Sequence, residues 1–449
     1  MIIKTEMAST GQETFQRLSC DYENLSSRFM LQDRNYQRQY AHLYSERLTL
    51  MRPALEEAAR RKWGEDAPLC HLYQLVGGEK RIVVGTLFKS MELKPSILKE
   101  ISEDRNLTPQ PSRERFSSDS DFLVLEDELQ RVVLTGDIDA QTAITGVVLA
   151  VKGFENDDGK FEVEDTCYVD LPSIEEYPPL DDDRYLILMS GLGIGNDQTD
   201  LMSLQLMVDI ITGQLGTADQ QKMFSKVVRV IIAGNSLSES TRDRDVLTTA
   251  KYLTRKSQAG TVEAIKTLDH LLVQLTSCIP VDLMAGDFDP ANSSLPQQPF
   301  HRCMFPQSSV YSTFNSVTNP YEAKIAGMRV LGSSGQNVTD IYQFTTMDDR
   351  LSILEQTLKY GHIAPSAPDT LACYPYYNKD PFIIKDCPAI YFAGNQPRFQ
   401  TKKVVTGSDD EEVLLVTVPS FQETKSCVIV NLRTMDCQPL IFSADLSSS

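Results

Sequence analysis

The polar residues of this chain that could do chemistry gather in four short loops. Each loop ends an apolar run of about four to eight residues, within the stretches 185–195, 227–235, 281–287 and 389–395. Asp287 and Asp289 place two carboxyl groups in the third loop, and His362 lies apart from all four. Carboxylates and imidazoles hold the metal ions that activate water for phosphodiester hydrolysis. Asp287, Asp289 and His362 could therefore be ligands of a metal-dependent phosphodiesterase or nuclease.

The apolar runs predict the elements that must position these loops. Runs of this length are typical of strands buried on both faces, and the glycines that follow let the backbone turn sharply. In open α/β sheets, loops at the carboxyl ends of strands line the functional crevice. A boundary at Pro178-Pro179 and at the acidic run 181–183 therefore introduces a predicted α/β domain over residues 176–449. Its predicted parts include a covering helix over 261–277 and late strands at 402–405, 413–418 and 427–432.

Three further segments are expected before this domain. Residues 1–32 lack a hydrophobic period and predict a mobile N-terminal arm. Residues 33–64 predict a helical segment with an apolar and tyrosine stripe, which Pro53 should divide into two helices. Residues 65–175 predict a five-stranded barrel of the oligonucleotide/oligosaccharide-binding (OB) type, with a mobile insertion over 103–121. The predicted strands are 81–88, 130–135, 145–152 and 160–168, with a hairpin turn at 156–159. The expected fold class is thus α+β, with an OB-type barrel followed by an α/β domain.

Charge disfavours nucleic acid as the ligand of this barrel. The chain has a net charge of −19, and residues 65–175 contain 11 Lys and Arg against 23 Asp and Glu, a balance of −12. Barrels that bind single strands use a basic groove with stacking aromatic residues. A barrel this acidic repels phosphates, so a protein-docking module is favoured over DNA binding.

Composition and missing motifs exclude other classes of function. The nine cysteines contain no Cys-x-x-Cys pair, which argues against a zinc ribbon and fits free thiols in a reducing compartment. No apolar run has the length of a membrane helix, and residues 1–6 lack the core of a signal peptide, so secretion is not expected. Gly191-x-Gly193-x-Gly195 has the wrong spacing for a dinucleotide fingerprint, and no Gly-x-Ser-x-Gly nucleophile elbow occurs.

The four loops resemble those of the calcineurin-like metallophosphoesterases. Active members have loops of the form Asp-x-His, Gly-Asp-x-x-Asp, Gly-Asn-His-Asp/Glu and Gly-His-x-His, with one separate histidine that His362 resembles. The ligand positions of this chain hold other residues: Gly191 and Gly193 in the first loop, Asn235 and Ser238 in the second, Asp287 and Phe288 in the third, and Asn395 and Pro397 in the last.

These replacements imply that the dinuclear metal centre of the family is lost. Gly, Phe and Pro side chains offer no lone pair to a metal ion, and a neutral amide at Asn235 cannot offset the charge between two cations. The whole chain has only five histidines. The resemblance therefore implies an inactive phosphoesterase domain with no metal, no cofactor and no catalytic residue.

An acidic barrel before such a domain resembles the small, B-type subunits of replicative DNA polymerases. The similarity covers about residues 33–443 and is strongest to the small subunits of polymerase delta, on long motifs at 38–42, 84–89, 123–131, 295–299, 334–338 and 362–371. This resemblance implies a non-catalytic nuclear subunit that serves DNA replication and repair synthesis. It would bind the C-terminal metal-binding module of the catalytic subunit and a third accessory subunit, with only indirect contact to DNA and none to membranes.

Overall fold

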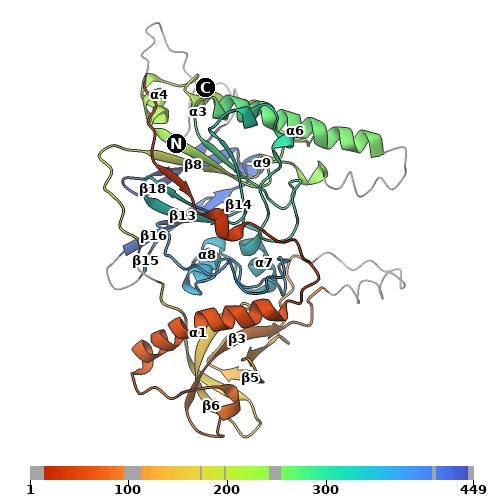
Figure 1. Ribbon diagram of the computed structural model, residues 1–449, viewed down its shortest axis with the longest axis vertical. Coiled ribbons are helices and arrows are strands. Elements are labelled where there is room, and N and C mark those ends of the chain that lie inside the picture. Colours follow the sequence, from red (N-terminus) through yellow and green to blue (C-terminus); the bar gives the residue numbers. More distant parts are fainter. Residues whose placement is uncertain are drawn as a thin grey trace.

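The computed structural model describes residues 15–95, 113–171, 174–196, 199–241, 254–406 and 411–442, without the side chains of 254–260, 406 and 411. Residues 1–14 of the expected arm and most of the expected insertion lie outside the described residues. A barrel with its long helix forms one end of the molecule, and a larger α/β body forms the other (Figure 1). No helix in the described ranges has the length and apolarity needed to cross a membrane.

The barrel closes as the sequence predicts. Its strands run in the order β2-β3-β4-β5-β7-β6, and pairing of β3 with β6 closes the circle. The bounds are β2 (Leu69–Cys70), β3 (Arg81–Ser90), β4 (Phe122–Glu126), β5 (Arg131–Gly136), β6 (Val148–Glu155) and β7 (Phe161–Cys167). The predicted hairpin turn at 156–159 joins β6 to β7, with Gly159 at φ +71°. The strand β4 is absent from the sequence prediction because its buried apolar run is only three residues long.

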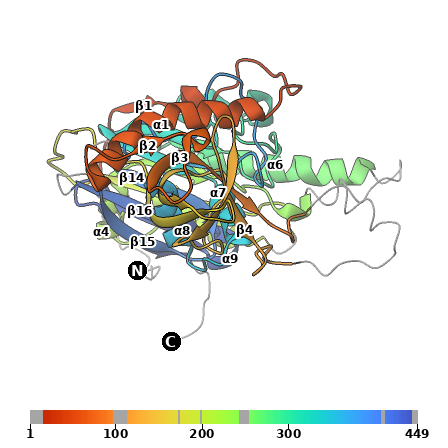
Figure 2. The same cartoon turned by 90° about the horizontal axis from the view of Figure 1, so that it is seen from below.

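The prediction of two helices around Pro53 is wrong. One helix, α1 (Ala41–Trp63), runs through the proline and packs across the barrel, as the view from the barrel end shows (Figure 2). Its buried side chains Leu48, Met51 and Leu55 join barrel residues in one core cluster. A proline costs a helix one backbone hydrogen bond, but burial of a continuous apolar face offsets that cost here.

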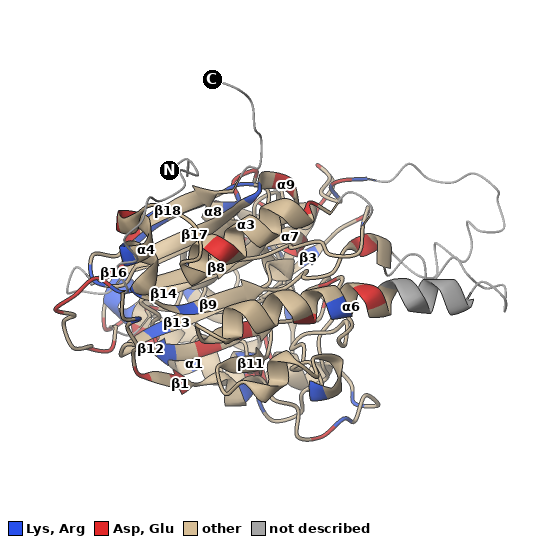
Figure 3. Ribbon diagram, turned by 90° about the horizontal axis from the view of Figure 1, so that it is seen from above, with Lys and Arg blue, Asp and Glu red and all other residues tan. Residues whose placement is uncertain are grey.

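The larger domain is a four-layer sandwich of two helical layers around two sheets. One six-stranded sheet has the order β11-β10-β9-β8-β17-β18, and the other has the order β1-β12-β13-β14-β16-β15. A core between the sheets contains Leu188, Ile231 and Phe392, and a core on each outer face holds the helices. The strands that precede the four loops are almost entirely buried, as predicted, since helices cover one face and the other sheet covers the second. Figure 3 shows charged residues mainly on helices, loops and outer strands.

The strands of this domain have the following bounds: β1 (Tyr22–Asn24), β8 (Tyr185–Met189), β9 (Val227–Ala233), β10 (Val281–Met284), β11 (Phe314–Val317), β12 (Tyr321–Ile325), β13 (Met328–Ser333), β14 (Ile390–Gln396), β15 (Gln400–Thr406), β16 (Glu411–Pro419), β17 (Ser426–Asn431) and β18 (Asp436–Ile441). Its α-helices are α3 (Leu201–Thr212), α4 (Ala218–Ser225), α6 (Thr254–Thr276), α7 (Gln336–Phe344), α8 (Arg350–Lys359) and α9 (Phe421–Thr424).

The expectation of a mobile arm is wrong for residues 15–32. Strand β1 pairs with β12 at the edge of a sheet of the larger domain. Arg17 donates to the carbonyl oxygens of Phe224 and Ile211, which lie in the helices α4 and α3. Phe29 is fully buried in the core to which α7 and α8 contribute. The sequence hides this role because the apolar residues are scattered between polar ones and show no period.

Buried polar contacts join the barrel end to the larger domain. Arg47 of α1 is 0% exposed, and its Nε lies 2.7 Å from Asp380 Oδ2. The same guanidinium donates to the carbonyl oxygens of Gly146, Pro365 and Ala367. One side chain therefore binds both the barrel loop and the larger domain.

Replacing Phe29 with Ala should lower the free energy of unfolding of the larger domain by about 3–5 kcal/mol, because a fully buried aromatic ring would leave a cavity. Chemical denaturation followed by tyrosine fluorescence measures this loss. Met30→Ala is the matched control, since the neighbouring Met30 is 42% exposed. Equal midpoints for the two variants would show that residues 15–32 do not support the fold.

Candidate functional site

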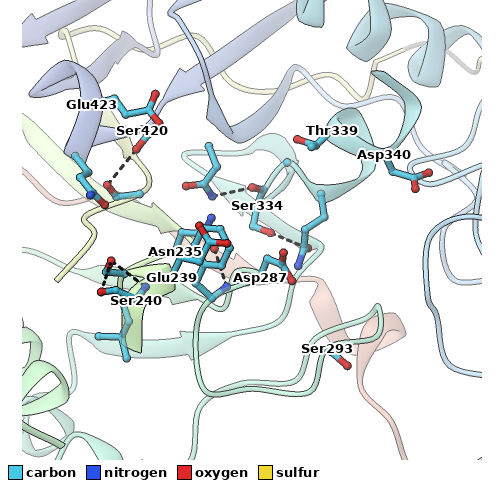
Figure 4. Close-up of a pocket in the computed structure, with 18 of the residues that line it drawn as sticks. Asn235, Glu239, Ser240, Asp287, Ser293, Ser334, Thr339, Asp340, Ser420 and Glu423 are labelled. Atoms are coloured by element: carbon cyan, nitrogen blue, oxygen red, sulfur yellow. Dashed lines mark hydrogen bonds between the residues drawn. The ribbon is translucent and has the colours of Figure 1, made fainter. Parts of the chain in front are cut away.

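The four predicted loops meet at one cleft of about 690 Å³. Gly191, Asn235, Asp287 and Asn395 each line it, one from every loop. Figure 4 shows Asn235, Asp287 and Ser334 gathered in the cleft, with Ser420 and Glu423 on another of its walls. The charged residues of its described lining are Glu239, Asp287, Asp340 and Glu423, so the cleft is acidic.

Other side chains occupy the space beside both glycines of the first loop. Gly191 and Gly193 both have a φ of +63°, which favours glycine. A Cβ atom added at Gly193 would lie 1.9 Å from Gln422 Oε1, and one added at Gly191 would lie 2.6 Å from Ser420 Oγ. The main chain of this segment is held in place, because the amide of Gln422 donates to the Gly191 carbonyl at 2.8 Å. It keeps Ser420 Cα 3.0 Å from the atom added at Gly191 and Gln422 Cβ 3.0 Å from the atom added at Gly193. The segment after β16 thus fills the space where the resemblance places Asp and His ligands.

The second and third loops bind each other. The Asn235 side-chain oxygen accepts a hydrogen bond from the Phe288 amide at 3.2 Å. Ser238 Oγ lies 3.1 Å from Ser240 Oγ, and Asp287 lines the cleft beside Phe288. The amide of Asn235 therefore orders the neighbouring loop.

The fourth loop is tied to three neighbouring segments. Asn395 has a φ of +54°, and its side-chain nitrogen donates to the carbonyl oxygens of Ala233 and Ser334 at 3.0 and 2.8 Å. Its own amide donates to Ser190 Oγ at 2.8 Å. Pro397 is exposed and is not among the residues that line the cleft.

Asp289 serves the backbone and is buried below the cleft. It is 6% exposed and accepts hydrogen bonds from the amides of Gly286, Ser236 and Leu237. Burial raises the pKa of this carboxyl to about 6, although the amide donors oppose the shift. Its oxygen atoms hold the second and third loops together.

His362 belongs to a different site. Its Nε2 lies 3.0 Å from Asp380 Oδ2, the carboxylate that also binds Arg47, and its Nδ1 accepts from the Ala364 amide at 3.2 Å. Burial, together with the Arg47 charge, lowers the pKa of His362 to about 4, so the ring is neutral. The hypothesis of a rebuilt site from Asp287, Asp289 and His362 is therefore wrong: two of the three are committed to structural hydrogen bonds.

The residues in the cleft do not fit a dinuclear metal centre. Two ligand positions are filled by other side chains, and the amides of Asn235 and Asn395 are engaged by backbone groups. Sequence reasoning missed Ser420 and Gln422, which occupy the space that the resemblance assigns to the first-loop ligands, because they lie far along the chain and carry no motif. The sequence predicted the positions of the four loops, but it did not predict which other residues line the cleft with them.

One further group of potential metal ligands lies on the barrel. Side-chain atoms of His71, Asp127 and Glu128 come within 4.8 Å of one another. Asp127 accepts from the amides of Leu72, Leu129 and Gln130, and Glu128 pairs with Arg52 at 2.7 Å. Through these contacts the group links α1 to the barrel, which is a structural role.

Comparison with known families matches both parts of the chain to subunits of replicative polymerases. Residues 39–166 match the family described as the DNA polymerase delta subunit OB-fold domain. Residues 186–401 match the family of B subunits of DNA polymerases alpha and epsilon. The class is thus that of B-type polymerase subunits, and the first match points to polymerase delta.

Relatives of full length narrow the class. The chain is 43% identical to the DNA polymerase delta subunit 2 of Drosophila melanogaster, over 96% of this chain and 99% of the relative. It is 41% identical to the DNA polymerase delta small subunit of Arabidopsis thaliana, over 99% of this chain and 100% of the relative. The corresponding yeast protein, from Saccharomyces cerevisiae, is 31% identical over 92% of each chain. The chain belongs to the family of DNA polymerase delta small subunits.

Replacing Gly193 with Ala should destabilise the protein by more than the backbone strain alone. Gly213→Ala is the matched control, because Gly213 has a φ of +82° with nothing within 4 Å of an added Cβ. The control should cost about 1–2 kcal/mol, and Gly193→Ala should cost about 1–3 kcal/mol more because Gln422 must move. Gln422→Ala in the Gly193→Ala background should recover the difference in chemical denaturation. Equal losses for both glycine variants would contradict the filled first loop.

His362 should make stability depend on pH. Its pKa in the folded state, about 4, lies below the value of an unfolded histidine, so the unfolded chain takes up the proton first. Stability contributed by the neutral ring is present at neutral pH and falls by about 1 kcal/mol between about pH 7.5 and 5.5. His362→Gln should remove this decrease. The measurement is the denaturation midpoint of the variant and of the parent protein at each pH, and the difference between the two should change as the pH falls. His270→Gln, at an exposed position of α6, should keep the parent's pH dependence. The same slope in His362→Gln and parent would contradict the assignment.

Proposed function

We propose that this chain is a non-catalytic scaffold of DNA polymerase delta. It is an accessory subunit of that polymerase and acts in DNA replication, as membership of the small-subunit family implies. One observation supports the proposed loss of catalysis. Gln422 and Ser420 occupy the space where active phosphoesterases have the two ligands of the first loop. The larger domain, over residues 176–449, is then an inactive member of the calcineurin-like phosphoesterases.

The acidic cleft also argues against hydrolysis of nucleic acid. Without metal ions, Glu239, Asp287 and Glu423 repel a phosphate group, and no basic residue occurs in the described lining. The four-layer sandwich with loops at the strand ends supports descent from a phosphoesterase scaffold. Such a scaffold offers rigid surfaces for partners once its chemistry is gone.

We expect two partners, each on its own surface. The C-terminal metal-binding module of the catalytic subunit should dock across the barrel, over residues 65–175, and the adjoining larger domain. A third accessory subunit should bind a separate face of the larger domain. Contact with DNA is then indirect, and the nucleus is the compartment in which this assembly serves replication and repair synthesis.

Charge supports the barrel as one docking surface. Asp157, Asp158 and Glu162 lie exposed on β7 and on the turn before it, and none of them forms an ion pair with a residue that the structure describes. A partner surface that is basic where it meets these carboxylates would gain steering from charge complementarity. The module of the catalytic subunit should therefore carry Lys and Arg on this side.

Changing Asp157, Asp158 and Glu162 together to Lys should weaken binding of the catalytic subunit's C-terminal module by about tenfold or more at low salt. Surface plasmon resonance with the immobilised module measures the loss, which should appear mainly in the association rate and shrink as salt rises. Binding of the third subunit should not change.

Asp181→Lys with Asp182→Lys is the matched control, since both carboxylates are exposed but lie outside the barrel. These variants should bind the module like the parent protein. If the barrel variant retains parental affinity and association rate, the barrel is not the docking surface. Family membership would stand in that case, because it rests on the sequence matches.

A further inference from the structure

An exposed group of aromatic rings lies where α1 meets the larger domain. We call Tyr36, Arg38, Tyr40, His42 and Tyr377 the tyrosine patch. Tyr36 is 55% exposed, Tyr377 is 54% exposed and Tyr40 is 41% exposed. Large aromatic side chains left in water at one place mark interaction sites more often than chance.

The rings of the patch are held in place before any partner binds. Tyr36 packs edge-on against Tyr374 with centroids 5.3 Å apart, and the Tyr40 hydroxyl donates to the Cys373 carbonyl at 2.8 Å. These contacts fix the first part of the patch on the segment 373–377. Side chains ordered in advance lose little conformational entropy on binding.

Tyr377 joins the second part of the patch. The ring of His42 lies 4.5 Å from that of Tyr377, and the Arg38 guanidinium carbon lies 5.8 Å from the same ring. Ordered tyrosines beside an arginine are the typical composition of binding hot spots. The patch therefore has the composition and the order of a docking surface.

The charge of the patch is opposite to that of the chain. Arg34 and Lys379 adjoin it in the sequence and have no carboxylate partner among the described residues. Asp33 is paired with Arg38 at 2.7 Å, and Glu46, one turn of α1 beyond His42, is half-buried. The only other acid over 373–385 is Asp380, which is buried and bound to Arg47. On a chain of net charge −19, this is a local site for an acidic group.

We propose that the tyrosine patch binds an acidic segment of a partner protein that carries aromatic or apolar anchor residues. Two cations without carboxylate partners are enough to orient one or two carboxylates but too few for a nucleic acid strand, which needs a row of phosphate contacts. The tyrosines receive the anchors, and Arg34 and Lys379 receive the carboxylates. This site is separate from the acidic barrel, whose partner must be basic.

A short fluorescein-labelled peptide that alternates Glu with Phe is the probe, used with the full chain in fluorescence anisotropy. It should bind saturably and weaken as salt rises. Tyr36→Ala with Tyr377→Ala should weaken binding at least about tenfold. Arg34→Glu with Lys379→Glu should weaken it and favour a peptide in which Lys replaces Glu.

Tyr73→Ala is the matched control, because Tyr73 is also 54% exposed but lies on the barrel. It should bind the probe like the parent, and thermal melting should show that all variants fold. The proposal is overturned if the Glu-Phe peptide does not bind, if the Lys-Phe peptide binds the parent as tightly, or if the tyrosine variants bind like the parent. Tighter binding of labelled oligothymidylate than of the peptide, lost with the same tyrosines, would make the site one for single-stranded DNA and also overturn it.

Discussion

The architecture depends on one buried guanidinium. Arg47 leaves α1, binds Asp380 and three carbonyl groups, and is fully removed from water. Asp380 in turn binds His362. Burial alone would raise the pKa of Asp380, but the Arg47 charge keeps this pKa below its usual value. A buried charge that loses its partner costs several kcal/mol, so these groups require one another. The barrel and the larger domain therefore present their surfaces at a fixed mutual orientation, which a scaffold for two partners needs.

Much of the fold was visible in the sequence, for identifiable reasons. Runs such as 185–189 and 227–233 predict buried strands because both faces are apolar, and the turn at 156–159 predicts the last hairpin of the barrel. The sequence did not predict two elements, because tertiary packing overrides their local signals. Pro53 lies inside a helix that the barrel surface supports, and β1 owes its strand conformation to pairing with β12, some 300 residues later in the chain.

Loop spacing in the sequence predicted only part of the candidate site. Loop order predicted that Gly191, Asn235, Asp287 and Asn395 would share a cleft, and they do. The sequence also offered His362 and Asp289 as ligands, because residue type alone does not reveal a hydrogen bond already made. The position of Gln422 beside Gly193 could not be foreseen, since a side chain that fills such a space needs only suitable volume and reach. The cleft is thus an ordered junction of backbone and amide contacts, and its remaining carboxylates make it unsuited to phosphate.

We propose that this cleft has structural contacts where active phosphoesterases have metal ligands. Calorimetric titration of the purified full-length chain with Mn²⁺, together with elemental analysis of the same sample, tests it most directly. We expect less than one tightly bound metal ion per chain and the same heat of titration for the parent and for Asp287→Asn. Two metal ions per chain, lost in Asp287→Asn and accompanied by metal-dependent phosphodiesterase activity, would contradict it.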